Sequence, residues 1–293
     1  MSDPITRLPE HARLAPPADM TQGKTASGVA YVAAGSGAPH LLFHGGAGSW
    51  RHWYLNIRAL SEHFRVIAID SPSYGASDPV PPDIAAEAYV DRVHSAVDEI
   101  VPAPERVHIS GFSFGGMIGA AVAARLGPRL ASLALVGTAG FPRKEIRDLG
   151  LVGRRKLAEA LGREPSEAEV RAMHSDNLAK LMIWDPAKID VTAIDIQAAN
   201  VARTRFDSRR LSWMGRMPEF LAAIQAPVKV IYGEHDTTTY PALEHRLEQV
   251  RAAKPEAEIE VVPGVGHWTQ YEAPDAVNRA LIQFHSRAES TRP

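Results

Sequence analysis

The stretch VHISGFSFGGMIGAAVAARLGP, residues 107–128, decides the fold of this chain. It begins with a short apolar run typical of a buried strand, passes through GFSFG at 111–115, and continues as an apolar helix that ends at Gly-Pro, 127–128. A serine in a tight strand-to-helix turn adopts strained backbone geometry, and glycines two residues to either side make room for it. Its hydroxyl then stands above the sheet, next to the positive end of the helix. We therefore interpret Ser113 as a nucleophile.

Short apolar runs alternate with helical patterns on both sides of this stretch. The runs that predict strands lie at 29–33, 41–43, 66–69, 107–110, 133–136, 228–232 and 259–262. The helical patterns lie at 50–61, 84–101, 117–126 and 241–253, with a last one after Pro274. This alternation predicts an open, mostly parallel sheet with helices on both faces.

The alternation stops after residue 140 and resumes at residue 225. Residues 141–224 carry helical patterns and many charges but no convincing strand, which indicates an inserted helical cap. The core is then expected to consist of residues 25–140 and 225–293. Residues 1–24 are expected to form an N-terminal arm, whose first twenty residues, rich in proline and charge, indicate a loose arm or a strap that lies on the surface.

Composition narrows the classes of function. The chain has 293 residues, of which 45% are hydrophobic and 23% charged, as in ordinary globular proteins. Lys plus Arg number 32 against 34 for Asp plus Glu, a net charge of −2, so no broad positive field favours nucleic acid or a membrane surface. No stretch reaches the ~18 apolar residues of a membrane span and the first residues lack a secretory pattern, so we expect a cytoplasmic protein.

The sequence predicts neither a metal nor another cofactor. Cysteine is absent, which excludes disulfide scaffolds, thiolate zinc sites and a cysteine nucleophile. No cluster of residues has metal-ligand spacing, and no P-loop lysine or G-x-G-x-x-G follows the glycine-rich loop at 44–48. The expected partner is a small molecule.

A histidine and a carboxylate follow two later strands. His267 lies in PGVGH, after the last predicted strand, at the carboxyl edge of the sheet, where ligands of α/β proteins bind. Asp236 ends GEHD after the strand at 228–232, with Glu234 as its competitor. The chain order Ser113, Asp236, His267 matches a hydrolase triad in which histidine is the base and the carboxylate fixes its tautomer.

Two backbone amides are candidates for an oxyanion hole. Phe114 directly follows the nucleophile, and Gly46 lies in His44-Gly-Gly after the run at 41–43. Such donors stabilise the negative charge that develops on a carbonyl oxygen under attack. We expect His44 to brace this loop.

With these residues located, the chain resembles the α/β-hydrolase superfamily from about residue 28 to 288. Within it, several segments resemble the meta-cleavage product hydrolases, which split vinylogous diketones made by aromatic ring opening. These segments are HGGAGSWRHWYLNI (44–57), VIAIDSPSYGASD (66–78), GFSFGG (111–116), YGEHD (232–236) and GHWTQYEAPDAVN (266–278). The resemblance implies an eight-stranded, mostly parallel sheet with a helical cap, and a possible homo-oligomer. Epoxide hydrolases and haloalkane dehalogenases share the last segment but carry an aspartate nucleophile, where this chain has Ser113.

The resemblance also implies substrate-binding residues. Asn56 and Trp268 would line the pocket, and an arginine of the cap, Arg203 or Arg205, would bind a substrate carboxylate. The family usually has an asparagine directly before the nucleophile, whereas this chain has Phe112.

Apolar cap residues are further candidates for the pocket wall. Among them are Trp184 and Trp213, and together with Phe112 they suggest a substrate that is apolar and of modest size. The sequence predicts a serine hydrolase that cleaves a small, largely apolar carboxylic ester or lactone through an acyl-enzyme on Ser113. A carbon–carbon bond hydrolase of the meta-cleavage type, and a non-catalytic ligand receptor on the same scaffold, remain the alternatives.

Overall fold

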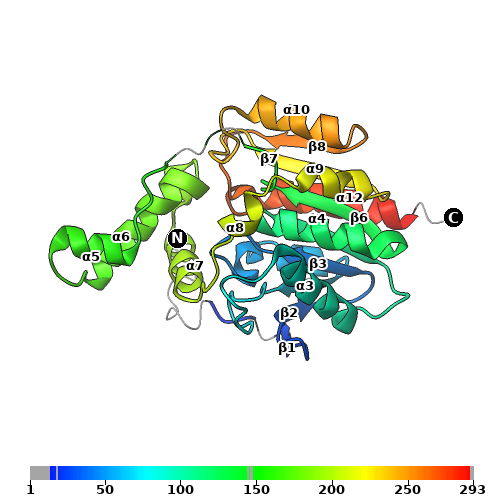
Figure 1. The fold of residues 1–293 in the computed structure, drawn as a ribbon, viewed down its shortest axis with the longest axis horizontal. Helices are drawn as coiled ribbons and strands as arrows, with labels where there is room; N and C mark the ends of the chain where they lie inside the picture. The colour runs from blue at the N-terminus through cyan, green and yellow to red at the C-terminus, as the bar shows by residue number, and fades with distance from the viewer. Residues whose placement is uncertain (1–13, 18, 144, 146–147, 291–293) are drawn as a thin grey trace.

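The computed structural model describes residues 14–17, 19–143, 145 and 148–290 (Figure 1). Within them, eight strands form one sheet in the order β1-β2-β4-β3-β5-β6-β7-β8. The strands are β1 (Thr21–Lys24), β2 (Ala30–Ala34), β3 (Pro39–Phe43), β4 (Arg65–Ile69), β5 (Val107–Phe112), β6 (Leu130–Val136), β7 (Val228–Gly233) and β8 (Glu258–Val262). β2 pairs antiparallel with β1 and β4, and all other pairs are parallel, which confirms the predicted sheet.

Helices cover both faces of the sheet. They are α2 (Ile57–Ser61), α3 (Ala86–Ile100), α4 (Phe114–Leu126), α10 (Leu243–Ala253), α11 (Thr269–Glu272) and α12 (Pro274–Ser290). Successive strand residues point to opposite faces, so Leu41 and Phe43 pack with α3, α4 and α10, while Leu42 packs with α2 and α12. Because both faces are buried, the central strands are continuously apolar, which is why short apolar runs located them.

The segment between β6 and β7 is helical, as predicted. Its helices are α5 (Arg154–Leu161), α6 (Glu167–Asn177), α7 (Val191–Ala202), α8 (Arg209–Ser212) and α9 (Met217–Ala223). α5, α6 and α7 lie to one side of the sheet and its covering helices (Figure 1), whereas α9 packs against α4 and α10. The division into a 25–140 and 225–293 core and a 141–224 cap stays a prediction. Among the described residues, no helix is long and apolar enough to cross a membrane.

The end of the expected arm is part of the sheet. Residues 21–24, the end of the expected N-terminal arm, form β1, an edge strand that pairs with β2. The TQGK sequence of β1 gave no signal because three of its residues are exposed and none is buried. Leu14 is also buried, and its carbonyl accepts a hydrogen bond from Arg51 Nε. Residues 1–13 and 18 lie outside the described residues.

Three histidines are buried together between the sheet and α12. Hydrogen bonds link His40 to Ser110 (2.7 Å), Ser110 to His285 (3.0 Å), His285 to Ser132 (2.7 Å) and Ser132 to His108 (2.7 Å). His108 and His285 are both fully buried, the latter because α12 turns it toward the strands. Burial, together with the neighbouring histidines, lowers the pKa of His40 and of His285 well below the ordinary value.

This histidine cluster makes the fold sensitive to acid. Below about pH 6.5, His40 and His285 bind protons in the unfolded chain. In the folded chain they stay neutral to lower pH, because their pKa values are lowered. The free energy of unfolding therefore has its full value above that pH. As the pH decreases further, it decreases by up to about 1.4 kcal/mol per pH unit for each such histidine. Urea unfolding between pH 7.5 and 5 measures this loss. His285→Gln should flatten the slope, and His245→Gln, at a partly exposed histidine outside the cluster, is the matched control. An equal slope in all three chains would contradict the assignment.

Candidate active site

Ser113 stands at the junction between β5 and α4 in a backbone conformation that side chains rarely adopt. Its φ is 52° and its ψ is −116°. The flanking glycines allow this close turn, because a Cβ at Gly111 would lie 2.6 Å from the Gly116 Cα and one at Gly115 would lie 2.5 Å from the Phe43 carbonyl carbon. Such strain is typical of a nucleophile elbow. The sequence prediction for this turn is confirmed in its geometry.

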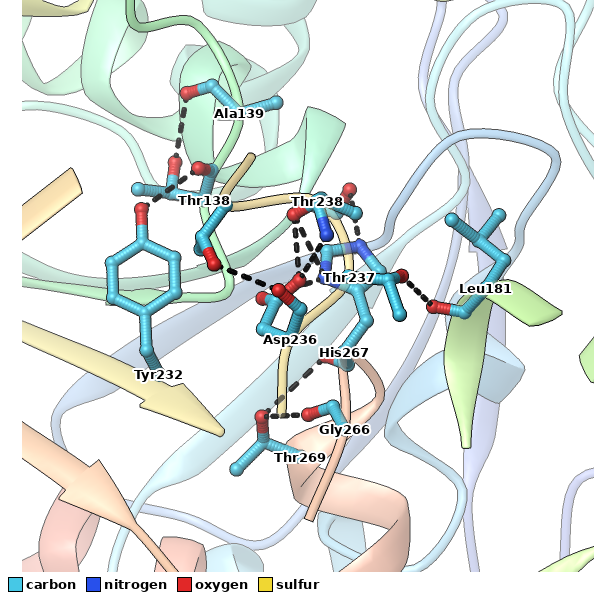
Figure 2. A network of polar contacts seen from close by, with 12 residues as sticks. Thr138, Ala139, Leu181, Tyr232, Asp236, Thr237, Thr238, Gly266, His267 and Thr269 are labelled. Atoms are coloured by element: carbon cyan, nitrogen blue, oxygen red, sulfur yellow. Dashed lines mark hydrogen bonds and ion pairs between the residues drawn. The ribbon is translucent and has the colours of Figure 1, made fainter. Parts of the chain in front are cut away.

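The structure brings Ser113, His267 and Asp236 into one relay. His267 Nε2 lies 3.0 Å from Ser113 Oγ, and His267 Nδ1 lies 2.9 Å from Asp236 Oδ2. Figure 2 shows Asp236, Thr238 and His267 gathered at the ends of β7 and β8. The histidine is thus within hydrogen-bond reach of the serine proton, and the carboxylate holds the other ring nitrogen. The arrangement fits a Ser-His-Asp triad.

The Asp236 carboxylate is held ionised by its neighbours. Burial raises its pKa, but His267 and donors from Thr238 outweigh burial, so the pKa lies below the ordinary value. Thr238 donates to Asp236 Oδ1 from its hydroxyl (2.7 Å) and its backbone amide (2.8 Å). Gly137 leaves room for the pair, since a Cβ there would lie 3.0 Å from His267 Nδ1.

Glu234, the competing carboxylate, points elsewhere. It is exposed, and its Oε2 accepts a hydrogen bond from the Gly264 amide at 2.9 Å. This contact ties the loop after β7 to the loop after β8. Glu234 therefore fits a bracing role, and the geometry favours Asp236 as the triad acid.

The loop after β3 lies directly against the nucleophile. His44 Nε2 accepts from the Ser71 amide (2.9 Å), and His44 Nδ1 lies 2.7 Å from Gly45 O, so the expected bracing contacts of His44 are present. A Cβ on Gly45 would lie 3.2 Å from the Ser113 Cβ, which shows how closely this loop approaches. Gly46 and Phe114 both line the cavity above Ser113. Their role as oxyanion donors stays a prediction.

A cavity of about 910 Å³ contains the reacting groups. Ser113 and His267 line it together with Phe112 and Trp213, two of the predicted pocket residues. The charged side chains on its wall are Arg143, Asp148, Lys156, Arg205, Asp207 and Arg209. Asp207 pairs with Arg209, at 2.7 Å. Of the other four charged residues, Arg143, Lys156 and Arg205 are positive and Asp148 is negative. This surplus of positive charge suits an anionic substrate.

Three predicted pocket residues do not line this cavity. Asn56 is buried, and its amide donates to Gln270 O (3.1 Å) and Asn278 Oδ1 (2.9 Å). Trp268 is fully buried, stacks on Tyr271 and donates from its indole nitrogen to His52 O. Trp184 is 53% exposed and stacks on His235. None of the three is therefore placed on the wall of this cavity, and Asn56 and Trp268 are instead packed in the core.

A buried glutamate that the sequence analysis missed fastens the His267 loop to the cap. Glu272 accepts hydrogen bonds from the backbone amides of Gly266 (2.7 Å), Trp184 (3.0 Å) and Asp185 (3.0 Å). Burial raises its pKa, although these amides act in the opposite direction. Thr237 adds a second link by donating to Leu181 O (2.9 Å), as Figure 2 shows. The signal in the sequence was a glutamate five residues after His267.

No metal site accompanies this arrangement in the described part of the chain. No group of three or more His, Asp or Glu side chains among those residues is placed to hold a metal ion. Ser113, His267 and Asp236 are placed as the nucleophile, base and carboxylate of a triad would be.

The chain belongs to the alpha/beta hydrolase family, which residues 41–280 match. Two curated relatives are hydrolases by name. The 2-hydroxy-6-oxononadienedioate/2-hydroxy-6-oxononatrienedioate hydrolase of Comamonas testosteroni is 28% identical over 86% of this chain and 88% of its own length. The 2-hydroxy-6-oxo-6-phenylhexa-2,4-dienoate hydrolase of Burkholderia cepacia is also 28% identical, with the same coverage.

Solved structures agree with this assignment. The meta-cleavage product hydrolase of Pseudomonas fluorescens is 25% identical, covers 92% of this chain and 99% of its own, and superposes with a TM-score of 0.65. A thermophilic esterase of Thermogutta terrifontis shares the fold at 23% identity, with the same coverage and a TM-score of 0.67. The protein is an α/β-hydrolase enzyme, similar to the meta-cleavage product branch.

The choice between Asp236 and Glu234 has a direct test. Asp236→Asn should lower kcat by about 10⁴-fold, because the imidazole loses the partner that fixes its tautomer and balances its charge. Glu234→Gln, which keeps an acceptor for the Gly264 amide, is the matched control and should keep kcat within a few-fold. Steady-state hydrolysis of p-nitrophenyl acetate measures both, and a larger loss in the Glu234 variant would show that the acid is misassigned.

Proposed function

We propose that this enzyme hydrolyses a carbon–carbon bond of an anionic vinylogous diketone through an acyl-enzyme on Ser113. The observation that carries the proposal is a Ser113–His267–Asp236 relay that opens into a cavity with a surplus of positive side chains. The names of the curated relatives support the same bond type. The ester or lactone reaction is the second candidate.

The relay supplies each proton transfer that this reaction needs. The dienol substrate first takes its keto form, with His267 as the proton carrier. His267 Nε2 then accepts the Ser113 proton while Oγ bonds to the carbonyl carbon, and the amides of Gly46 and Phe114 hold the oxyanion. When the oxyanion collapses, the carbon–carbon bond breaks, its electron pair enters the conjugated dienolate, and His267 returns the proton there. Water activated by His267 finally hydrolyses the acyl-enzyme.

Arg205 is the residue of choice for the anionic end of the substrate. It lines the cavity, whereas Arg203, the other cap arginine that the resemblance implied, is not among the lining residues. The backbone amide of Arg205 donates to Ser73 O (3.0 Å), and one of its guanidinium nitrogens donates to Ser77 O (2.6 Å). These contacts orient the guanidinium, which has further N–H groups to offer a carboxylate.

Phe112 is the observation that favours an ester or lactone substrate. It lines the cavity next to Ser113, where the resemblance implies an asparagine, and its ring has no hydrogen-bond donor. A substrate with fewer polar groups near the nucleophile suits this wall. A non-catalytic receptor would differ from both candidates by giving a single acylation with p-nitrophenyl acetate and no continuous release.

One assay separates the two bond types and tests Arg205. A ring-fission dienol ketone bearing a carboxylate should lose its visible absorbance on incubation with the enzyme. Arg205→Gln should raise KM for this substrate by roughly tenfold to a hundredfold, the loss expected for one charge-assisted hydrogen bond, and leave p-nitrophenyl acetate nearly unchanged.

Arg203→Gln is the matched control and should change neither substrate. Continuous turnover of the ester with no loss of dienol ketone absorbance would replace the carbon–carbon proposal by the ester one. An equal effect of Arg205→Gln on both substrates would show that Arg205 only supports the local backbone.

A further inference from the structure

A hydroxyl group of the cap segment lies against the loop that carries Gly46. Ser208 directly precedes α8 and lines the cavity that contains Ser113. A Cβ on Gly46 would lie 2.5 Å from Ser208 Oγ and 3.9 Å from the Phe114 Cβ. Since the amides of Gly46 and Phe114 are the predicted oxyanion donors, the Ser208 hydroxyl is next to one of them and near the other.

The Ser208 hydroxyl does not cap the helix that follows it. A serine directly before a helix commonly accepts a hydrogen bond from a backbone amide of the first turn. The side chain of Ser208 makes no such bond, and the Arg209 amide donates to Asp207 Oδ1 (3.1 Å) instead. The hydroxyl lies against Gly46 rather than over its own helix.

The backbone around Ser208 is fixed to the core, although it belongs to the cap segment. Phe206 is buried and stacks on Tyr89, with ring centroids 4.9 Å apart. The Phe206 carbonyl accepts a hydrogen bond from the Tyr74 hydroxyl (2.9 Å), and the Ser208 carbonyl accepts from the Ser212 amide (2.9 Å). A donor on such a backbone is held in place before the reaction begins, as stabilisation of a developing charge requires.

We propose that the Ser208 hydroxyl is a third oxyanion donor, which the cap adds to the amides of Gly46 and Phe114. The inference rests on the proposed acyl-enzyme on Ser113, and it holds for either bond type. Ser208 keeps its proton throughout and contributes a hydrogen bond, so His267 remains the only group that moves protons. The cap segment then takes part in the chemistry and not only in the choice of substrate.

The Tyr74 phenol is the partner of this hydroxyl before the reaction begins. Burial raises the pKa of Tyr74, and hydrogen bonds from Ser208 oppose this rise, so the phenol is neutral at pH 7. A hydroxyl proton rotates to suit its acceptor, and a charged oxygen is a stronger acceptor than a neutral one. The Ser208 proton therefore turns from Tyr74 to the oxyanion as the negative charge develops. A bond made only at that stage raises kcat and leaves KM unchanged.

Removing the hydroxyl tests this donor. Ser208→Ala should lower kcat for p-nitrophenyl acetate by about 10-fold to 100-fold, the range of one charge-assisted hydrogen bond to an oxyanion. KM should stay within about twofold, because the bond is absent from the substrate complex. Thermal unfolding shows whether the variant is folded. Ser208→Gly removes the same hydroxyl and should give the same loss should Ser208→Ala fail to fold.

Two ketones separate an oxyanion donor from a residue that only supports the local fold. The ketone 1,1,1-trifluoro-4-phenylbutan-2-one adds to an active serine as a hemiketal, whose negative oxygen takes the oxyanion position. The plain ketone 4-phenylbutan-2-one binds without adding. Ser208→Ala should weaken inhibition by the trifluoromethyl ketone by the same factor by which it lowers kcat, and should keep the Ki of the plain ketone within about twofold.

Ser175→Ala is the matched control. Ser175 is a partly buried serine of α6, in the same cap segment, and it does not line the cavity that contains Ser113. This variant should change neither kcat nor the Ki of either ketone. An unchanged kcat in Ser208→Ala, or an equal weakening of both ketones, would overturn the proposal.

The outcome is separable from that of the proposed function. An active parent chain whose kcat is unchanged by Ser208→Ala would reject this inference alone. A loss on the ester, in a chain whose parent leaves the dienol ketone intact, would support the third donor and reject carbon–carbon cleavage. A parent chain that cleaves neither substrate would reject both.

Discussion

The positive φ of Ser113 is the constraint on which the site depends. It arises because β5 ends in the sheet and α4 begins at once, so one residue must reverse the chain direction. Backbone hydrogen bonds stabilise this strained conformation of Ser113. Its amide donates to Val136 O (2.9 Å), and its carbonyl oxygen accepts from the amides of Gly116 and Ala139 (3.0 Å each). The hydroxyl is thereby presented from a fixed backbone, which an oxyanion site and a base need if they are to act on one atom.

The parallel sheet explains how distant parts of the chain meet at this hydroxyl. The loops after β3, β5, β7 and β8 all leave from the same edge, and they bring Gly46, Ser113, Asp236 and His267. Glu272 links the cap to this edge of the sheet. Its carboxylate accepts hydrogen bonds from the Gly266 amide in the His267 loop and from the amides of Trp184 and Asp185. The segment that ends at Leu181 and Met182 on the cavity wall is therefore fixed to the same loop that carries His267.

The sequence predicted the sheet and the relay because both leave local signals. Apolar runs mark the buried strands, and Ser113, Asp236 and His267 come one, three and five residues after the end of a strand. The pocket was less predictable, since cavity walls depend on side-chain direction and on packing between segments far apart in sequence. Phe112 and Trp213 line the cavity as expected. The Asn56 amide instead donates to Gln270 O and Asn278 Oδ1, the Trp268 indole donates to His52 O, and Trp184 stacks on His235. Edge strand β1 escaped notice because a polar, exposed strand has no pattern of period two.

The most direct measurement of the central claim is the position of a covalent adduct. A fluorophosphonate reacts only with a serine whose hydroxyl is activated by a nearby base and whose adduct oxygen is accepted by backbone donors. Peptide mapping by mass spectrometry after labelling should place one adduct on Ser113, and Ser113→Ala should abolish it while keeping the far-ultraviolet circular dichroism of the parent chain. An adduct on another residue, or undiminished labelling of the Ser113→Ala chain, would contradict the account.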